Sequence, residues 1–403
     1  MIDNISISTN KKLRNYSTLA LALFYTLLPF EYPLASLGVN SIIRYIGILS
    51  MGLSIIDIII NEKYKIRIDY RHKLLLCWLL LVFVSYLWSE GKQFFETYAL
   101  IYLRNALMFL LISCVKYTRY EEKIIRNSYV LGGVFLLLYM TFVPGAVTYS
   151  AWQKRLTLAA GDTTLDQNYL AVLIAIPFAF VFYDFINNHS NNLIKRILMI
   201  IFCFGCLYYI IATGSRTGLL SITIMSLLSL KLNTKKNIIG IIITIALLFI
   251  VFPVIYQLMP SNLLDRFTVE AFTGRTGESG ARLIIWKAAM NDVSFDPALI
   301  IGHGAGSAQV VVSKTTSHYS AIHNHYISQF IELGLVGITV IMTFMIKMLI
   351  NVYVKRRDVA IAFLGIFIAA FFIDVLTTKS FWAIIIYVSI VISSYKSEES
   401  LND

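Results

Sequence analysis

The chain has 403 residues, of which 58% are hydrophobic and only 14% charged, and its formal net charge is +11. A soluble domain carries roughly 25% charged residues, so this composition excludes a soluble globular protein or a single-span anchored domain and predicts an integral membrane protein. The positive charge does not indicate a nucleic-acid partner, because the cytoplasmic loops of membrane proteins collect Lys and Arg.

Apolar segments along the chain predict an all-α polytopic membrane protein with about twelve transmembrane helices. In chain order they lie near residues 17–36, 42–60, 74–89, 98–115, 128–147, 169–187, 196–213, 217–232, 238–257, 326–354, 359–377 and 380–395. Residues 1–257 are expected to form helices 1–9 with short loops, and residues 323–403 to form helices 10–12 and a C-terminal tail. Between them, residues 258–322 are expected to form one large external loop domain containing short amphipathic helices, one of them over residues 282–290.

The distribution of basic residues predicts the orientation of these helices. Most of them fall in loops on the same side as the N-terminus, namely Lys63, Lys65, Arg67, Arg71, Lys73, Lys116, Arg119, Lys123, Arg126, Lys195, Arg196, Lys231, Lys235, Lys236, Lys355, Arg356 and Arg357. By the positive-inside rule this side is the cytoplasm, so both termini are predicted to be cytoplasmic. The chemistry is then expected on the opposite, external face.

Several cations fall on that external face, against the topological bias, and are predicted to meet an anion or a nearby carboxylate. They are Lys154, Arg155, Arg216, Arg266, Arg275, Arg282 and Lys287. Arg216 lies in a short turn with glycines on both sides, which lets a ligand approach the backbone while the guanidinium binds phosphate oxygens. The alternative is an arginine that snorkels to lipid headgroups.

Arg282 opens the predicted amphipathic helix, and helical spacing places it on one face with Trp286. An interfacial Trp286 would anchor this helix flat against the membrane while Arg282 reaches an anion at headgroup depth. The alternative is an ordinary surface helix with a solvated arginine. Arg275 and Arg266 have carboxylates close in sequence, so simple ion pairing could account for either.

Two further clusters lie at predicted helix starts. His323 and Asn324 precede the tenth helix, where a neutral imidazole can accept a proton from a sugar hydroxyl, or instead cap the helix. Asp166 and Asn168, with Asp162, stand at the entry to the sixth helix, where they cap it or, together with Arg155, recognise sugar hydroxyls. His323 and His325 have the spacing of some zinc sites, which is the alternative, but no carboxylate lies between Lys314 and Gln329, so neither metal nor cofactor is expected.

These motifs resemble those of the bacterial O-antigen ligases and the related O-antigen and exopolysaccharide polymerases. His323-Asn324, nine residues and then Gly334-Leu335-Val336-Gly337 match the superfamily's His-Asn-x9-Gly-x-x-Gly pattern. Ser215-Arg216-Thr217-Gly218 resembles its Ser-Arg turn, Gly280-Ala281-Arg282 through Trp286 its Gly-Arg-x3-Trp segment, and Asp166-Gln167-Asn168 its Asp-Pro-Asn. The Gly-Arg match is one residue longer here, which leaves open whether Arg275 shares the role of Arg282.

The resemblance implies inverting, metal-independent glycosyl transfer on the periplasmic face of the bacterial inner membrane. The donor would be a glycan on undecaprenyl diphosphate, and a chain-length regulator is a possible further partner. Carried over by position, Arg216 and Arg282 would hold the diphosphate, and His323 would act as general base or orient the acceptor. The acceptor would be a lipid-linked repeat unit for a polymerase, which the turn after Arg216 slightly favours, or lipid A-core for a ligase.

A transporter of lipid-linked oligosaccharides is the main alternative of a different class. A carrier is expected to place its binding residues near the membrane midplane, whereas the polar residues here gather at one face. Arg104, Asp57, Asp184 and Asp374 are charges placed well inside or near the ends of apolar segments, and they form no paired relay in sequence. A metal-dependent hydrolase of lipid diphosphates would need a carboxylate-rich site that the sequence lacks.

Overall fold

The computed structural model describes residues 15–36, 42–60, 68–149, 155–160, 163–188, 192–230, 278–291, 297–316 and 318–402. The predicted transmembrane segment 238–257, Asp162 and the candidate site residue Arg275 lie outside these ranges. The N-terminal part of the predicted loop domain, up to residue 277, also lies outside them.

The first half of the chain forms α1 (Ser17–Leu27), the 3-10 turn η1 (Leu28–Phe30), α2 (Glu31–Ser36), α3 (Ile42–Ile60), α4 (Tyr70–Val84), η2 (Ser85–Leu87), α5 (Lys92–Cys114), α6 (Arg119–Phe142), α7 (Gln167–Asn187), α8 (Leu193–Ala212) and α9 (Arg216–Ser229). The second half forms α13 (Glu278–Asn291), α14 (Pro297–Ile301), α15 (Ala308–Thr316), α16 (His325–Lys355), α17 (Arg357–Ala369) and α18 (Lys379–Asn402). Most of the apolar segments are therefore helical, as the sequence predicts.

Seven of the described helices are long and apolar enough to span a membrane: α3, α4 with η2, α5, α6, α7, α8 and α16. Two shorter apolar helices are α9 and the part Lys379–Tyr395 of α18. The first predicted segment, 17–36, is broken into three pieces around Pro29, whose ring nitrogen cannot donate a helical hydrogen bond. A multi-pass membrane protein is thus supported, while the count of twelve crossings stays a prediction.

The centre of the bundle is α7, because it is hydrophobic on every side. In its membrane-length window 83% of the residues are buried, against 28% in α8, which lies at the edge. α7 packs against α6, α8, α9 and α17. Near its N-terminal end Asn168 is buried, whereas Asp166 is exposed.

A small antiparallel sheet corrects the all-α expectation. It lies between α6 and α7 and consists of β1 (Val147–Tyr149), β2 (Leu156–Ala160) and β3 (Thr163–Thr164), in the order β1-β2-β3. Thr148 pairs with Thr157, and Ala159 pairs with Thr164. The sequence signal was weak because the strands are short, but β2 packs against α2 and α7 and so brings Arg155 to the start of α7.

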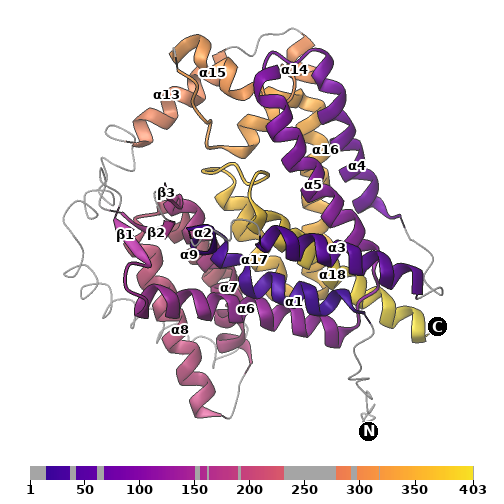
Figure 1. Cartoon of the computed structure of the whole chain (residues 1–403), viewed down its shortest axis with the longest axis vertical. Helices are drawn as coiled ribbons and strands as arrows, with labels where there is room; N and C mark the ends of the chain where they lie inside the picture. The colour runs from indigo at the N-terminus through magenta and orange to yellow at the C-terminus, as the bar shows by residue number, and fades with distance from the viewer. Residues whose placement is uncertain are drawn as a thin grey trace.

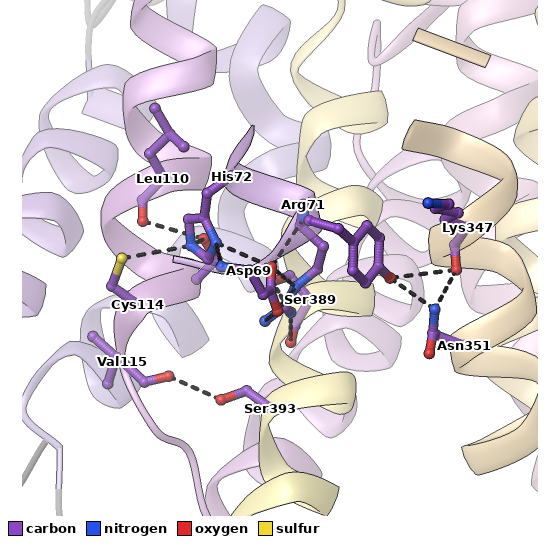
Figure 2. Close-up of polar contacts among 12 residues, drawn as sticks. Asp69, Arg71, His72, Leu110, Cys114, Val115, Lys347, Asn351, Ser389 and Ser393 are labelled. Atoms are coloured by element: carbon purple, nitrogen blue, oxygen red, sulfur yellow. Dashed lines mark hydrogen bonds and ion pairs between the residues drawn. The ribbon is translucent and has the colours of Figure 1, made fainter. Parts of the chain in front are cut away.

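A polar cluster joins α4, α5 and α18 at the end where the sequence predicts cytoplasm (Figure 2). Asp69 caps α4, accepting from the backbone N–H of Arg71 at 3.0 Å, and contacts the His72 Nδ1 at 3.1 Å. The His72 Nε2 lies 2.9 Å from the Ser113 Oγ, and the Arg71 Nη1 donates to the Ser389 Oγ at 2.7 Å. Burial would raise the pKa of Asp69, but hydrogen bonds from His72 and Arg71 lower it well below its usual range. The cluster therefore ties three helices together.

α16 is interrupted at Gly334, whose backbone angles are φ 63° and ψ −164°. The interruption frees two carbonyls of α16: the Ile331 oxygen accepts from the His303 N–H at 2.9 Å, and the Glu332 oxygen accepts from the Gly304 N–H at 2.9 Å. A Cβ on Gly334 would lie 2.3 Å from the Ile300 oxygen, so only glycine allows this contact. The glycine-rich loop after α14 therefore docks into the break in α16.

Candidate functional site

The turn before α9 holds Arg216 at the first helical position. Ser215 is the N-cap, and its Oγ accepts from the Gly218 N–H at 3.1 Å. The same hydroxyl donates to the Asn168 Oδ1 at 2.8 Å, so the turn is tied to the start of α7. Gly214 has φ +60°, a conformation that glycine adopts without strain. The half-buried Arg216 is therefore presented from a fixed helix N-terminus.

Arg155 stabilises this turn through hydrogen bonds. It is only 2% exposed, its Nε donates to the Thr213 oxygen at 2.8 Å, and its Nη2 donates to the Asn168 Oδ1 at 3.2 Å. The Asn168 side chain, also buried, thus accepts from both Arg155 and Ser215. In the structure Arg155 and Asn168 position the turn of Arg216, and direct contact of either with a sugar stays a prediction.

Asp166 caps α7, which confirms one of the two interpretations of that motif. Its Oδ1 accepts from the backbone N–H of Asn168 at 2.9 Å and of Tyr169 at 3.0 Å. The carboxylate is exposed, so it stands at the surface beside the buried network. A second role in sugar recognition is untested.

A second group of predicted residues surrounds the segment before α16. The Trp286 Nε1 donates to the Ile322 oxygen at 2.9 Å, and its ring packs against a small core of Ala289, Ala308, Val311, Val312, Ile322 and Ile331. Trp286 therefore holds the residue directly before His323, whereas the sequence interpretation has it anchoring the helix at the membrane surface. Arg282 lies one turn earlier on the same helix and is half-buried.

His323 has φ +51°, and it is the one non-glycine residue with a positive φ in the described part of the chain. Such a conformation is uncommon for residues with a Cβ, and strain of this kind often marks functional positions. The side chain of His323 is exposed, while Asn324 caps α16 by accepting from the Ile327 N–H at 3.1 Å. The capping role therefore belongs to Asn324, and the imidazole of His323 is turned out of the helix start.

Sequence reasoning missed a polar group between the η2–α5 turn and the loop region. The Glu90 carboxylate contacts the His303 Nδ1 at 2.8 Å and the Lys314 Nζ at 2.8 Å. Burial would raise the pKa of Glu90, but hydrogen bonds from Lys314 and His303 outweigh it and lower the pKa. These residues come from the η2–α5 turn, the glycine-rich loop and α15, and no spacing in the sequence links them.

The buried carboxyl of Glu332 was also unassigned. It accepts from the Gly306 N–H at 3.1 Å and lies 3.5 Å from the Gln329 Nε2, while the Gln329 Oε1 accepts from the Trp78 Nε1 at 3.0 Å. A charged residue within an apolar segment was the signal that could have singled it out. Together these contacts fasten the glycine loop and α4 to α16.

The helices α9 and α13, which carry Arg216 and Arg282, lie in different parts of the molecule (Figure 1). α9 packs against α7 and α17, whereas α13 packs against α15 and α16 at the end where α4 and α5 extend furthest. Arg216 and Arg282 are therefore carried by separate packing units, and their joint binding of one diphosphate stays a prediction. No group of three or more metal-ligating side chains occurs among residues for which the structure gives a placement.

The fold and these sites define a multi-pass membrane protein with polar side chains gathered at the ends of its helices. Residues 198–342 match a family described as O-Antigen ligase. This region, which runs from α8 into α16 and includes Arg216, Arg282, His323 and Asn324, is similar to that family. No curated protein matches the chain. The resemblance read from the motifs is thus confirmed at the level of the superfamily.

Proposed function

We propose that the protein transfers a glycan from undecaprenyl diphosphate to a sugar hydroxyl on the periplasmic face of the bacterial inner membrane. The observation that carries the proposal is the buried network of Arg155, Asn168 and Ser215, which fixes Arg216 at the N-terminus of α9. A helix N-terminus carries partial positive charge and free N–H groups, so it adds to the attraction of Arg216 for a phosphate. The superfamily match supports the same class of reaction.

The reaction proposed is a single inverting displacement. The acceptor hydroxyl oxygen attacks the anomeric carbon, the bond from that carbon to the diphosphate oxygen breaks, and the electron pair leaves with the lipid diphosphate. His323 accepts the proton of the hydroxyl, a role for which an exposed imidazole is suited near neutral pH. Arg216 and Arg282 stabilise the charge that develops on the leaving group, so the step needs no metal ion. Asn324 and Trp286 hold the segment of His323 in place.

The acceptor distinguishes two forms of this activity. A repeat-unit polymerase, which we favour slightly, uses the end of another lipid-linked glycan, whereas a ligase uses lipid A-core. Reconstitution of the full chain with lipid-diphosphate-linked repeat units tests both. A ladder of products without core supports the polymerase, and one addition to core supports the ligase. Movement of substrate across the bilayer with no new glycosidic bond would support the transporter and overturn both transferases.

Two variants test the assigned residues. His323→Ala should lower the transfer rate roughly 100-fold or more, the usual scale for a lost general base, while His318→Ala, a second exposed histidine in the same segment, should not. Arg216→Gln should lower transfer about as strongly, and Arg196→Gln on the exposed face of α8 is its control. Full activity of Arg216→Gln, with the protein folded, would remove the diphosphate assignment.

A further inference from the structure

A pocket outside both groups of candidate residues lies between α1, α3, α5 and α18. Three cationic side chains line it: Arg44 of α3, Arg104 of α5 and Lys379 of α18. Arg104 is the charge that the sequence placed well inside an apolar segment and that the proposed reaction does not use. In the predicted topology the N-terminal ends of α3 and α18 are periplasmic, so Arg44 and Lys379 lie on the face assigned to the chemistry.

The two arginines of this pocket form no ion pair with the part of the chain that the structure describes. Neither guanidinium makes a hydrogen bond with these residues, and the two positive charges repel each other. The Glu31 carboxylate attracts Arg104 without forming an ion pair with it. Lys379 is paired with Glu31 of α2. Three cations and one carboxylate leave a local charge of +2. A pair of unpartnered arginines at membrane depth is unfavourable unless an anion neutralises it.

A neutral donor completes the set. Asn105 follows Arg104, lines the same pocket and is only 4% exposed, yet its Nδ2 has no hydrogen-bond partner among the residues with a described placement. A buried amide N–H without an acceptor is unfavourable, so an acceptor oxygen is expected to satisfy it. Phosphate oxygens suit both this amide and the guanidiniums, because they accept several hydrogen bonds and carry charge.

The remaining wall of the pocket is apolar and includes Phe24, Ile43, Met51, Met108 and Ile386. An anion in free solution gains nothing from such a wall, whereas a lipid would lay its hydrocarbon chain along it. The local charge of +2 matches a diphosphate diester, which carries two negative charges, better than a phosphatidylglycerol headgroup, which carries one.

From this arrangement we infer that the pocket between α3, α5 and α18 binds the headgroup of a second lipid diphosphate. Resting on the proposed function, this lipid is the acceptor substrate, held apart from the donor diphosphate at Arg216. A polymerase binds two lipid-linked glycans at once. The donor glycan is released from its lipid diphosphate, whereas the acceptor glycan stays attached to its own. The second pocket gives the acceptor lipid a place of its own.

The number of bound lipids tests the inference without any turnover. The full chain in detergent is incubated with unglycosylated undecaprenyl diphosphate, and bound copies are counted by native mass spectrometry. The wild type should bind two, Arg216→Gln one, and Arg44→Gln/Arg104→Gln one. Each arginine lost should weaken its own site roughly tenfold or more. Arg44 is exposed, so Arg44→Gln alone tests the site on a folded protein, with Arg196→Gln as control.

Several outcomes would overturn the inference. Unchanged binding of two lipids by Arg44→Gln/Arg104→Gln would show that the pocket is not the second site. Equal competition by phosphatidylglycerol would assign it to bulk lipid, and equal competition by inorganic pyrophosphate would assign it to a free anion. A protein that binds two lipids but transfers no glycan would overturn the proposed function and leave this site standing. Loss of one lipid in Arg216→Gln but not in Arg44→Gln/Arg104→Gln would overturn this site and leave the proposed function standing.

Discussion

The side chain of Asn168 connects the two elements that hold Arg216, so its removal is the sharpest test of the site. Asn168→Ala removes the Oδ1 atom that accepts two hydrogen bonds. One comes from the neutral hydroxyl of Ser215 at 2.8 Å, and the other from the charged guanidinium of Arg155 at 3.2 Å. A neutral hydrogen bond contributes about 0.5–1.5 kcal/mol and one to a charged group about 1.5–3 kcal/mol. The substitution should therefore destabilise the fold by about 2–4.5 kcal/mol.

The catalytic effect follows from the position of Arg216. Without Asn168, the Ser215 turn loses its link to α7, and a misplacement of about 1 Å can lower a rate roughly 100-fold. Glycan transfer from the lipid-linked donor and SDS titration of the folded protein measure the two effects. Asn168→Asp keeps an acceptor oxygen and should recover most of the stability.

A matched control lies at the opposite end of α7. Asn188 is exposed and its Nδ2 donates to the Asp184 Oδ1 at 2.8 Å, so Asn188→Ala should change stability by less than about 0.5 kcal/mol. Wild-type stability together with wild-type transfer in Asn168→Ala would refute the reasoning. A rise in KM with an unchanged kcat would instead assign Asn168 to sugar binding.

Three further predictions follow from the contacts around α16. Gly334→Ala places a Cβ within 2.3 Å of a backbone oxygen at φ +63°, so it should lower the free energy of unfolding by more than about 2 kcal/mol. Gly52→Ala is the control, because the space around Gly52 is open, and it should be neutral or stabilising. Equal melting temperatures for the two variants would contradict this prediction. Trp286→Phe removes the hydrogen bond to Ile322 but keeps most of the ring, so it should lower the free energy of unfolding by about 0.5–1.5 kcal/mol and lower the transfer rate. An unchanged transfer rate would show that this bond does not position His323. The pKa of Glu90 is lowered in the folded protein, so its contribution to stability is present above its unfolded pKa and is lost as pH falls through the lowered value. Protection of α15 from hydrogen exchange should fall over that range in the wild type and not in Glu90→Gln, and parallel curves for the two proteins would remove this role.

The pattern of apolar residues in the sequence predicted most of the helices, because hydrophobic runs and capping residues determine helix formation through residues close in sequence. Asp166 and Asn324 illustrate this, since each caps the helix that begins directly after it. The short strands around Thr157 were not predictable in the same way, because their stability comes from packing against α2 and α7.

The sequence by itself predicted a membrane protein similar to the O-antigen ligases and polymerases, with Arg216, Arg282 and His323 as its candidate residues. Only the tertiary structure decided how Arg155 and Asn168 act, since they reach the turn of Ser215 across 58 and 47 residues of chain. It likewise brought Arg44 and Arg104 into one pocket from different helices. Helix formation and topology depend on near neighbours and on average composition, whereas these contacts depend on how distant helices pack.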